Sequence, residues 1–249
     1  MTWIQTASGR AFDLLNPDWR QVDFEVDVPE SLARIARFTG HVRAGPYSVA
    51  QHCVIGADAV FNETRNRKAA AAFLLHDAHE AYLGDIATPI VLALAARARS
   101  IADQTNKLVN GEAALFGDEL LRAAVATIKA GLDDAIWTAA GIAEVRGSSP
   151  FPEVVKAMDR RMLATEVRHL LGPPPQPWTT LDGIEPIRMV GRIVVWSWPQ
   201  AADEYRDRLR RYLPETFGPV RPSLSPGPIP GFAARQAAKP PARRTLTEA

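Results

Sequence analysis

The N-terminal segment carries apolar side chains in two short stretches, "TWIQT" at residues 2–6 and "AFDLL" at residues 11–15. Ser8 and Gly9 lie between them, and this pair favours a tight turn. Two short stretches of this kind joined by a turn are typical of a β hairpin. The sequence therefore predicts a short hairpin at the N-terminus.

The apolar residues that follow recur every three or four positions, which is the period of one face of an α-helix. Ser48 is a candidate N-cap, as is Ser148 or Ser149, whereas Gly84 is expected to end a helix. The expected helices cover residues 27–38, 49–62, 68–83, 90–117, 119–145, 151–171 and 199–213.

Two segments near the C-terminus do not follow the helical period. Residues 187–198 are strongly apolar and can form either a short strand or a loop packed on the helices. Residues 215–249 are rich in proline and end in basic and polar residues, which is typical of a disordered tail. We therefore expect a mostly α protein with a short N-terminal β hairpin, a domain at residues 1–214 and a core at about residues 30–172.

Composition narrows the class of protein. The chain is 47% hydrophobic and 23% charged, the balance of a soluble globular protein, and its net charge of +1 argues against a nucleic-acid duplex as partner. A single cysteine, Cys53, cannot form an internal disulfide. The N-terminus lacks the pattern of a signal peptide, and no apolar run approaches the ~20 residues of a membrane span. We expect a cytoplasmic protein with no membrane partner.

Ionisable residues interrupt the apolar pattern at residues 74–89, "LLHDAHEAYLGDIATP". On a helix, Asp77 lies about 100° and Glu80 about 40° from His76, so one arc holds an imidazole and two carboxylates. Buried charges of this kind are costly unless they are paired or bind a metal. For His76 and Asp77 alone, a buried ion pair that stabilises two helices is the favoured interpretation.

Two further residues complete a candidate metal site. His52 lies in the middle of an apolar helix, and Asp159 lies on an apolar helix face where a carboxylate is unusual without a partner. Together with His76 and Asp77 they offer two nitrogens and two oxygens to one divalent ion. Such a set suits Mn, Co, Fe, Ni, Zn or Mg and does not select among them.

This order of residues resembles the HD-domain metal-dependent phosphohydrolases. "HDAHEAYLGDIATP" is similar to the "HDASE…GD…TP" segment of bacterial HD-domain 5′-deoxynucleotidases and of related phage deoxynucleoside triphosphohydrolases. "RFTGHVRAGPYSVAQHCV" is similar to their first-ligand segment, which has an arginine–aromatic pair before the histidine. The resemblance covers about residues 30–170 and implies an HD-domain helical bundle.

The resemblance also implies roles for individual residues. His52, His76, Asp77 and Asp159 match the metal ligands, and Glu80 matches the acid that handles the attacking water. Arg37 matches the phosphate-binding arginine, Phe38 the aromatic residue beside the sugar and Asp85 the residue that contacts the sugar hydroxyl. His41, with Arg43, is placed to contact a longer phosphate chain.

The activity that the resemblance implies is release of phosphate from deoxynucleoside 5′-monophosphates. The alternatives are removal of tripolyphosphate from a deoxynucleoside triphosphate and, in a different class, a non-catalytic nucleotide-sensing HD module. Val91, Ala87 and His79 depart from the pattern of the relatives, which often have lysine, proline and a small residue there. Relatives form dimers or larger assemblies, so a homo-oligomer is expected on the same ground.

Several of these residues also have a purely structural interpretation. Arg37 can pair with Glu30 or Glu166, and Phe38 can belong to the core. Asp85 can be a turn residue.

Other residues near the site also have more than one interpretation. His79 and His169 fit surface or supporting positions better than ligand positions. Glu166 can support the site or pair with Arg160 or Arg161. The interval between His79 and His169 contains no histidine, which favours a single ion.

Overall fold

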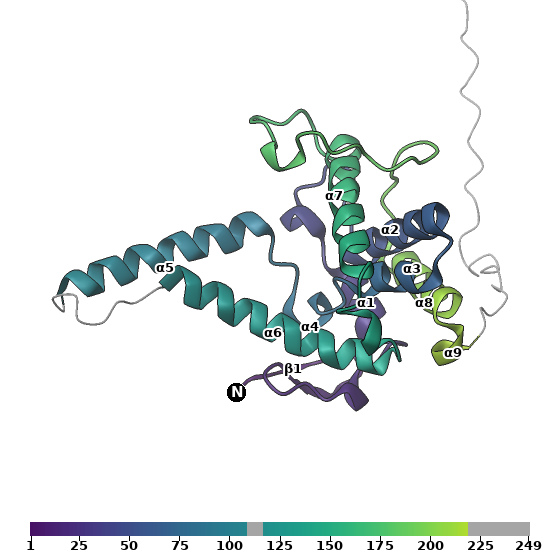
Figure 1. The fold of residues 1–249 in the computed structure, drawn as a ribbon, viewed down its shortest axis with the longest axis horizontal. Helices are drawn as coiled ribbons and strands as arrows, with labels where there is room; N and C mark the ends of the chain where they lie inside the picture. The colour runs from purple at the N-terminus through teal and green to yellow at the C-terminus, as the bar shows by residue number, and fades with distance from the viewer. Residues whose placement is uncertain (109–116, 219–249) are drawn as a thin grey trace, which may run out of the picture.

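The structure is a computed structural model that describes residues 1–108 and 117–218, and it confirms the mostly α fold with a small N-terminal hairpin (Figure 1). Strands β1 (Trp3–Gln5) and β2 (Ala11–Asp13) pair antiparallel, with Ile4 opposite Phe12. The buried Phe12 ring stacks on Tyr82, with ring centroids 3.9 Å apart, and this contact joins the hairpin to the helices.

The helices that position the candidate site come from distant parts of the chain. Helices α2, α3 and α7 contact one another, and α8 packs against α1, α2 and α3. The bounds of the helices are α1 Asp27–Arg34, α2 Val49–Thr64, α3 Arg67–Leu75, α4 Glu80–Leu83, α5 Thr88–Leu108, α6 Gly117–Ala139, α7 Phe151–Leu170, α8 Trp198–Tyr212 and α9 Pro214–Phe217.

Small side chains bring α2 and α3 close together. Residues 69–72 of α3 are four alanines, all buried, and Gly56 of α2 faces the ring of Phe73. The missing side chain at Gly56 leaves room for that ring, because a Cβ there would meet it at 2.0 Å. Close packing of this kind holds the last turn of α3 in a defined place on α2.

Helices α5 and α6 lie side by side and project from the other helices as an arm (Figure 1). Several of the apolar side chains of α5 are exposed, among them Leu92 and Leu94 with 48% and 52% of their surface accessible. Residues 109–116, which belong to the expected helix 90–117, lie outside the described residues.

Four predictions about the helices need correction. The expected helix 119–145 ends at Ala139, and residues 143–145 form a separate 3-10 turn. The expected helix 68–83 is broken after Leu75, because residues 76–79 form turns between α3 and α4. The expected helix 27–38 ends at Arg34, where the chain turns into an extended segment. The expected serine cap of α7 is wrong, because Pro150 holds the cap position and no side chain bonds to it, whereas Ser48 does cap α2 through the backbone N–H of Gln51.

The two C-terminal predictions have different outcomes. Residues 187–197 run as an irregular loop, so the alternative of a loop is confirmed. The tail was expected from residue 215, but α9 continues to Phe217, and Pro214 supplies the fixed backbone angle that suits a first helical turn. The remainder of that prediction, residues 219–249, lies outside the described residues.

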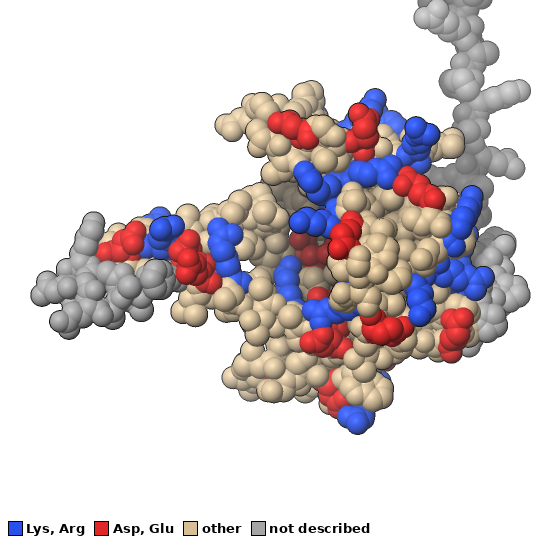
Figure 2. Space-filling model, in the orientation of Figure 1, with Lys and Arg blue, Asp and Glu red and all other residues tan. Residues whose placement is uncertain are grey.

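Two further findings concern the charges on the protein surface and the hydropathy of the helices. Figure 2 shows Lys and Arg side chains interspersed with Asp and Glu on the face that it draws, as the net charge of +1 leads one to expect. In the described part of the chain, no single helix has the length and apolar character to cross a membrane. One pair of segments, Arg67–Leu83 with Thr88–Gln104, reaches that length and hydropathy only as a bent pair with an angle of 52° between them.

Candidate metal centre

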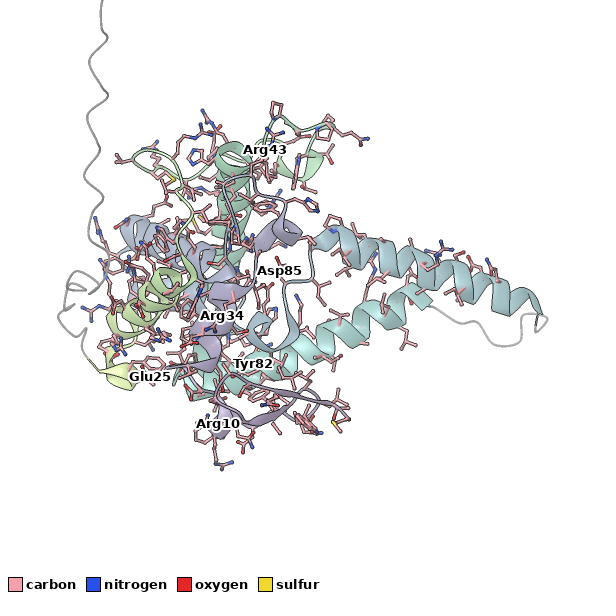
Figure 3. All side chains as sticks on the ribbon, turned by 180° about the vertical axis from the view of Figure 1, so that it is seen from behind. Arg10, Glu25, Arg34, Arg43, Tyr82 and Asp85 are labelled. Atoms are coloured by element: carbon pink, nitrogen blue, oxygen red, sulfur yellow. The ribbon has the colours of Figure 1, made fainter. Side chains whose placement is uncertain are left out.

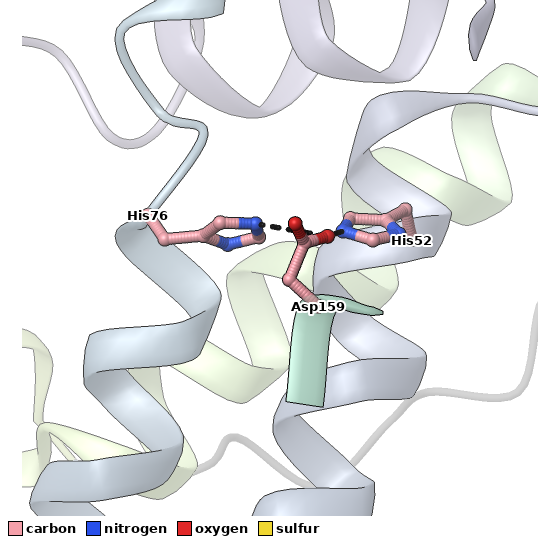
Figure 4. A group of neighbouring side chains, drawn as sticks. All are labelled: His52, His76 and Asp159. Carbon is pink, nitrogen blue, oxygen red and sulfur yellow. Dashed lines mark ion pairs between the residues drawn. The ribbon is translucent and has the colours of Figure 1, made fainter. Parts of the chain in front are cut away.

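Three side chains from three helices converge at the junction of α2, α3 and α7 (Figure 4). The carboxylate of Asp159 lies between the rings of His52 and His76. Its Oδ1 is 3.4 Å from Nε2 of His52 and 3.8 Å from Nε2 of His76. The remaining nitrogen of His76, Nδ1, is 2.6 Å from the carbonyl oxygen of Phe73, which orients this ring with Nε2 toward the other two side chains.

Asp77 adds a fourth donor to this group. Its Oδ2 lies 3.1 Å from Nε2 of His76 and 3.8 Å from Nε2 of His52. Neighbouring ligands of one ion lie about 3 to 3.5 Å apart when the bonds are near 2.1 Å. The distances of 3.1 and 3.4 Å match this range, and the two distances of 3.8 Å are slightly longer. Nε2 of His52 and Nε2 of His76 are buried without a hydrogen-bond partner among the described residues. His52, His76 and Asp159 are therefore near enough to one another to hold a metal ion, and Asp77 lies beside both histidines.

The break between α3 and α4 changes how Glu80 reaches this group. The backbone N–H groups of His76, Ala78 and Glu80 bond to carbonyls three residues back, so this stretch is wound more tightly than an α-helix. Side chains three apart overlay in such a turn, which brings Glu80 over Asp77. Oxygens of Asp77 and Glu80 and a ring nitrogen of His79 lie within 4.8 Å of one another.

The electrostatics of the four side chains favour positive charge between them. Burial raises the pKa of Asp77, but the neighbouring His76 outweighs it and the net pKa lies well below its ordinary value. Burial also raises the pKa of Asp159, and the neighbouring His52 and His76 likewise bring it far down. Burial and the charge of Arg37 act to lower the pKa of His52, but Glu166 and Asp159 outweigh them and raise it. Burial acts to lower the pKa of His76, but Asp77 and Asp159 outweigh burial and raise it. The site thus stabilises a cation, whether proton or metal.

Glu80 is buried at the edge of this group, with 5% of its surface accessible. Burial, followed by the charges of Asp77 and Asp85, raises the pKa of Glu80 to about 9. Its Oε2 has no hydrogen-bond partner among the described residues. In the metal-free protein this carboxyl group therefore holds a proton at neutral pH, and a cation bound beside it favours its ionised form.

Arg37 reaches the site from an unusual turn. The 3-10 helix η2 (Arg37–Gly40) contains Phe38 and Thr39 in the left-handed region, with φ of 55° and 53°. Just before it, Ala36 pairs with Ser48, and the N–H of Arg37 donates to the carbonyl of Tyr47 at 2.8 Å. This pairing joins the arginine to the start of α2. Backbone strain of this kind persists only where surrounding contacts hold it.

The guanidinium of Arg37 lies between two carboxylates. Its Nη2 is 3.2 Å from Oε2 of Glu166, and its Nη1 is 3.5 Å from Oδ2 of Asp77. The pairing with Glu166 is one of the two that the structural interpretation offered, and the pairing with Glu30 is absent from the described ion pairs of Arg37. Arg37 nevertheless borders the metal ligands, so the structural and the phosphate-binding interpretations are compatible.

The three remaining candidates, Asp85, Phe38 and His41, differ in how closely they approach the converging side chains. Asp85 lies on the connection between α4 and α5 (Figure 3), and its pKa is raised by burial and by Asp77 against the charge of Arg37. Phe38 is half-buried and packs against the small cluster around Tyr47, as its core interpretation expected. His41 is exposed, and its side chain has no hydrogen bond or ion pair with another described residue.

Two buried residues, Glu166 and His79, make more contacts near the site than the sequence alone indicated. Glu166 is fully buried and contacts Arg37, Tyr47 and His52, whereas Arg161 pairs with Glu63 instead. The seven-residue spacing from Asp159 was the signal that pointed to it.

His79 is the second of them. It is not a surface residue, because only 6% of it is accessible and its Nδ1 lies 2.9 Å from Oδ1 of Asp133 on α6.

Cys53 and Lys129 lie near the site but were not predicted from the sequence as site residues. The thiol of Cys53, whose pKa burial raises to about 11, lies within 4.8 Å of donor atoms of His76 and Asp77. Lys129 lies one helical turn before Asp133, and its charge acts on Glu80 and Asp85. Position 129 lies on a projecting helix, so local sequence gives no signal for it.

A separate cavity of about 260 Å³ lies between the hairpin, α1 and α4. Arg34 and Tyr82 line it (Figure 3), together with Asp27, whose carboxylate accepts hydrogen bonds from Ser8. None of the four converging metal-site residues lines this cavity. We therefore place the candidate chemistry at the α2–α3–α7 junction.

Comparison with known proteins gives relatives of unknown activity. No protein-family model matches the chain. An uncharacterized protein of Rhodobacter capsulatus is 37% identical over 95 residues, which make up 37% of this chain and 48% of that protein. The uncharacterized protein YfdR of Escherichia coli K12 is 40% identical over 92 residues, 36% of this chain and 47% of its own length. The chain spans about half the length of the curated relatives it matches, and their names assign no activity.

Proposed function

We propose that the chain is a metal-dependent phosphohydrolase of the HD-domain type that acts on deoxynucleotides. The activity that we propose first is release of phosphate from deoxynucleoside 5′-monophosphates. The observation that carries the proposal is the convergence of His52, His76, Asp77 and Asp159, with two buried Nε2 atoms that have no hydrogen-bond partner among the described residues. Glu80 and Arg37 border this group, so a base and a phosphate-binding cation stand beside the metal ligands.

His52, His76, Asp77 and Asp159 would hold one divalent ion. When bound, the ion supplies Lewis-acid activation of the phosphate and makes a nearby water more acidic. The choice among Mn, Co, Fe, Ni, Zn and Mg is open, because a set of two nitrogens and two oxygens accepts each of them.

The protein's own residues account for the remaining steps. Glu80 is assigned to accept the proton of the attacking water, because its carboxylate borders Asp77 and its Oε2 has no hydrogen-bond partner among the described residues. The water oxygen bonds to phosphorus as the bond between phosphorus and O5′ breaks. O5′ takes up the proton that Glu80 accepted, so the deoxynucleoside leaves with a 5′-hydroxyl. Arg37 donates N–H groups to the phosphate oxygens as their charge grows. Asp85 is assigned to the sugar hydroxyl.

Lys129 favours a second candidate activity, removal of tripolyphosphate from a deoxynucleoside triphosphate. Its charge acts on Glu80 and Asp85 from the side of α6, and it forms no ion pair with a described residue. A free cation on that side suits a longer phosphate chain. Arg43, beyond η2, is exposed and lies well apart from Asp85 in Figure 3, so it suits a terminal phosphate better than the reacting one.

One experiment tests these proposals together. The purified full-length chain is incubated with each dNMP and dNTP in the presence of Mn²⁺ or Co²⁺, and the products are separated. Inorganic phosphate from a dNMP supports the first activity, and tripolyphosphate with a deoxynucleoside supports the second. Nucleotide binding without turnover for any substrate and metal contradicts both and leaves a nucleotide-sensing module.

A further inference from the structure

One buried carboxylate joins the candidate metal site to the candidate phosphate-binding residue. Glu166 lies on α7, two turns after Asp159, and none of its surface is accessible. Its Oε1 is 2.6 Å from Nδ1 of His52 and accepts a hydrogen bond from Tyr47 at 2.8 Å. Its Oε2 accepts one from Arg37 at 3.2 Å. Glu166 itself is not among the four converging ligands.

The bond to His52 decides which ring nitrogen faces the ion. Because Oε1 of Glu166 accepts at Nδ1, the proton of a neutral ring sits on Nδ1 and the lone pair sits on Nε2. Nε2 is the atom that faces Asp77 and Asp159, at 3.8 and 3.4 Å. Carboxylates that accept from the outer nitrogen of a ligating histidine fix its tautomer and raise its basicity.

The bond to Arg37 orients the second group. The guanidinium is held from Glu166 on one side and Asp77 on the other, and only 13% of the side chain is accessible. Arg37 comes from a strained turn, so its direction depends on what it touches inside the protein. Of these two carboxylates, Glu166 is the one that is not itself a proposed metal ligand.

We propose that Glu166 is a positioning residue that sets the metal ligand His52 and the phosphate-binding Arg37 at the same time. The inference rests on the proposed metal-dependent function. A residue with this double role affects metal affinity and nucleotide KM together, whereas a residue that only packs α7 against η2 affects stability alone. Tyr47 completes the arrangement, because its hydroxyl satisfies Oε1 without touching the metal ligands.

The test compares Glu166→Gln with a control substitution of a glutamate that also pairs with an arginine. Glu166→Gln keeps the shape of the side chain but removes the charge that Arg37 and His52 face. The control is Glu63→Gln, because Glu63 forms a two-point ion pair with Arg161 of α7 at 2.8 and 2.9 Å, away from the metal ligands. Mn²⁺ binding is measured by the loss of the free Mn²⁺ signal in electron paramagnetic resonance, which needs no turnover.

We expect Glu166→Gln to weaken Mn²⁺ binding ~10- to 100-fold and to raise the KM of the nucleotide, while Glu63→Gln leaves both unchanged. Unchanged Mn²⁺ affinity in a folded Glu166→Gln variant overturns the inference. Absence of Mn²⁺ binding in the unaltered chain instead contradicts the proposed function itself, so the two failures are distinguishable.

A measurement on the unaltered chain covers the case in which Glu166→Gln does not fold. In ¹⁵N-labelled protein loaded with Zn²⁺, we expect His52 to show a protonated Nδ1 in a strong hydrogen bond, with the proton signal far downfield. Nδ1 without a proton in the Zn²⁺-loaded protein overturns the inference.

Discussion

A Cβ atom at position 56 would lie 2.0 Å from Cε1 of the Phe73 ring, so α2 and α3 meet at this point only because residue 56 is glycine. The same ring packs against both candidate ligands, with its centroid 5.6 Å from that of His52 and 4.4 Å from that of His76. Its backbone carbonyl also accepts from His76. Because Phe73 contacts Gly56 and both histidines, a change at Gly56 is expected to move the candidate ligands.

Gly56→Ala is expected to weaken both stability and metal binding. Alanine favours the helix by about 1 kcal/mol over glycine, but overpacking a core typically costs about 1 to 3 kcal/mol. We expect the ring of Phe73 to shift and to move His76 away from Asp77. Urea unfolding and a Mn²⁺ titration of the same preparation measure the two effects.

Gly131→Ala is the matched control for Gly56→Ala. Gly131 lies inside α6, and a Cβ there would meet only a side-chain atom of Pro17 at 3.9 Å, an ordinary contact. This variant is expected to be as stable as the unaltered chain or slightly more stable, with unchanged metal affinity. Equal losses in the two variants would show that the Phe73 contact does not govern the result, because only Gly56 faces that ring.

Asp77→Ala is expected to abolish metal binding and turnover. The substitution removes the carboxylate that faces both histidines and leaves Arg37 with Glu166 alone. Metal content after dialysis against Mn²⁺ or Co²⁺ and the turnover rate are the measurements. Asp182→Ala, at an exposed position, serves as the control, and full turnover by Asp77→Ala would exclude the metal site.

Glu80→Gln is expected to change how the stability of the metal-free protein depends on pH. Because the pKa of Glu80 rises from 4.5 to about 9 on folding, the folded protein holds a proton between these values that the unfolded chain has released. This group's contribution to the unfolding free energy is therefore full below about pH 4.5 and is lost as pH rises toward 9. Glu80→Gln keeps a neutral side chain, so its stability is expected to fall less over this range.

The activity of Glu80→Gln completes that prediction. Loss of a general base is expected to lower kcat ~10²- to 10⁴-fold, while Mn²⁺ affinity falls little. Urea unfolding at pH 5, 7 and 9 and steady-state kinetics give the two readouts, with the exposed Glu153→Gln as control. An unaltered pH slope together with unaltered kcat would remove Glu80 from the mechanism.

Removal of divalent metal is expected to lower the unfolding midpoint, because the ion binds the folded state and its ligands come from three separate helices. At an ion concentration 100 times Kd, the added stability is about 2.7 kcal/mol. Thermal unfolding before and after treatment with a chelator, followed by return of Mn²⁺ or Co²⁺, measures it. The same unfolding midpoint in both states contradicts binding at this junction.

The sequence by itself determined the mostly helical class, the N-terminal hairpin and the identity of the four converging side chains. These came from local signals: the helical period, turn residues, and ionisable residues placed where apolar ones are expected. His52, His76, Asp77 and Asp159 each stand out against an apolar stretch of their own, so each was visible without knowledge of the others' positions.

Only the tertiary structure decided how these side chains are supported. Glu166 meets His52 across 114 residues of sequence, and His79 meets Asp133 across 54. The spacing of residues along α7 alone does not show whether Glu166 supports His52 or pairs with an arginine of the same helix. The tight turns at residues 76–79 depend equally on tertiary contacts, since Phe73 is seated against Gly56 and Tyr205 of α8 bonds to the carbonyl of Leu74 at 3.0 Å. Local sequence favours a continuous helix there, and contacts between distant helices end it one residue before His76.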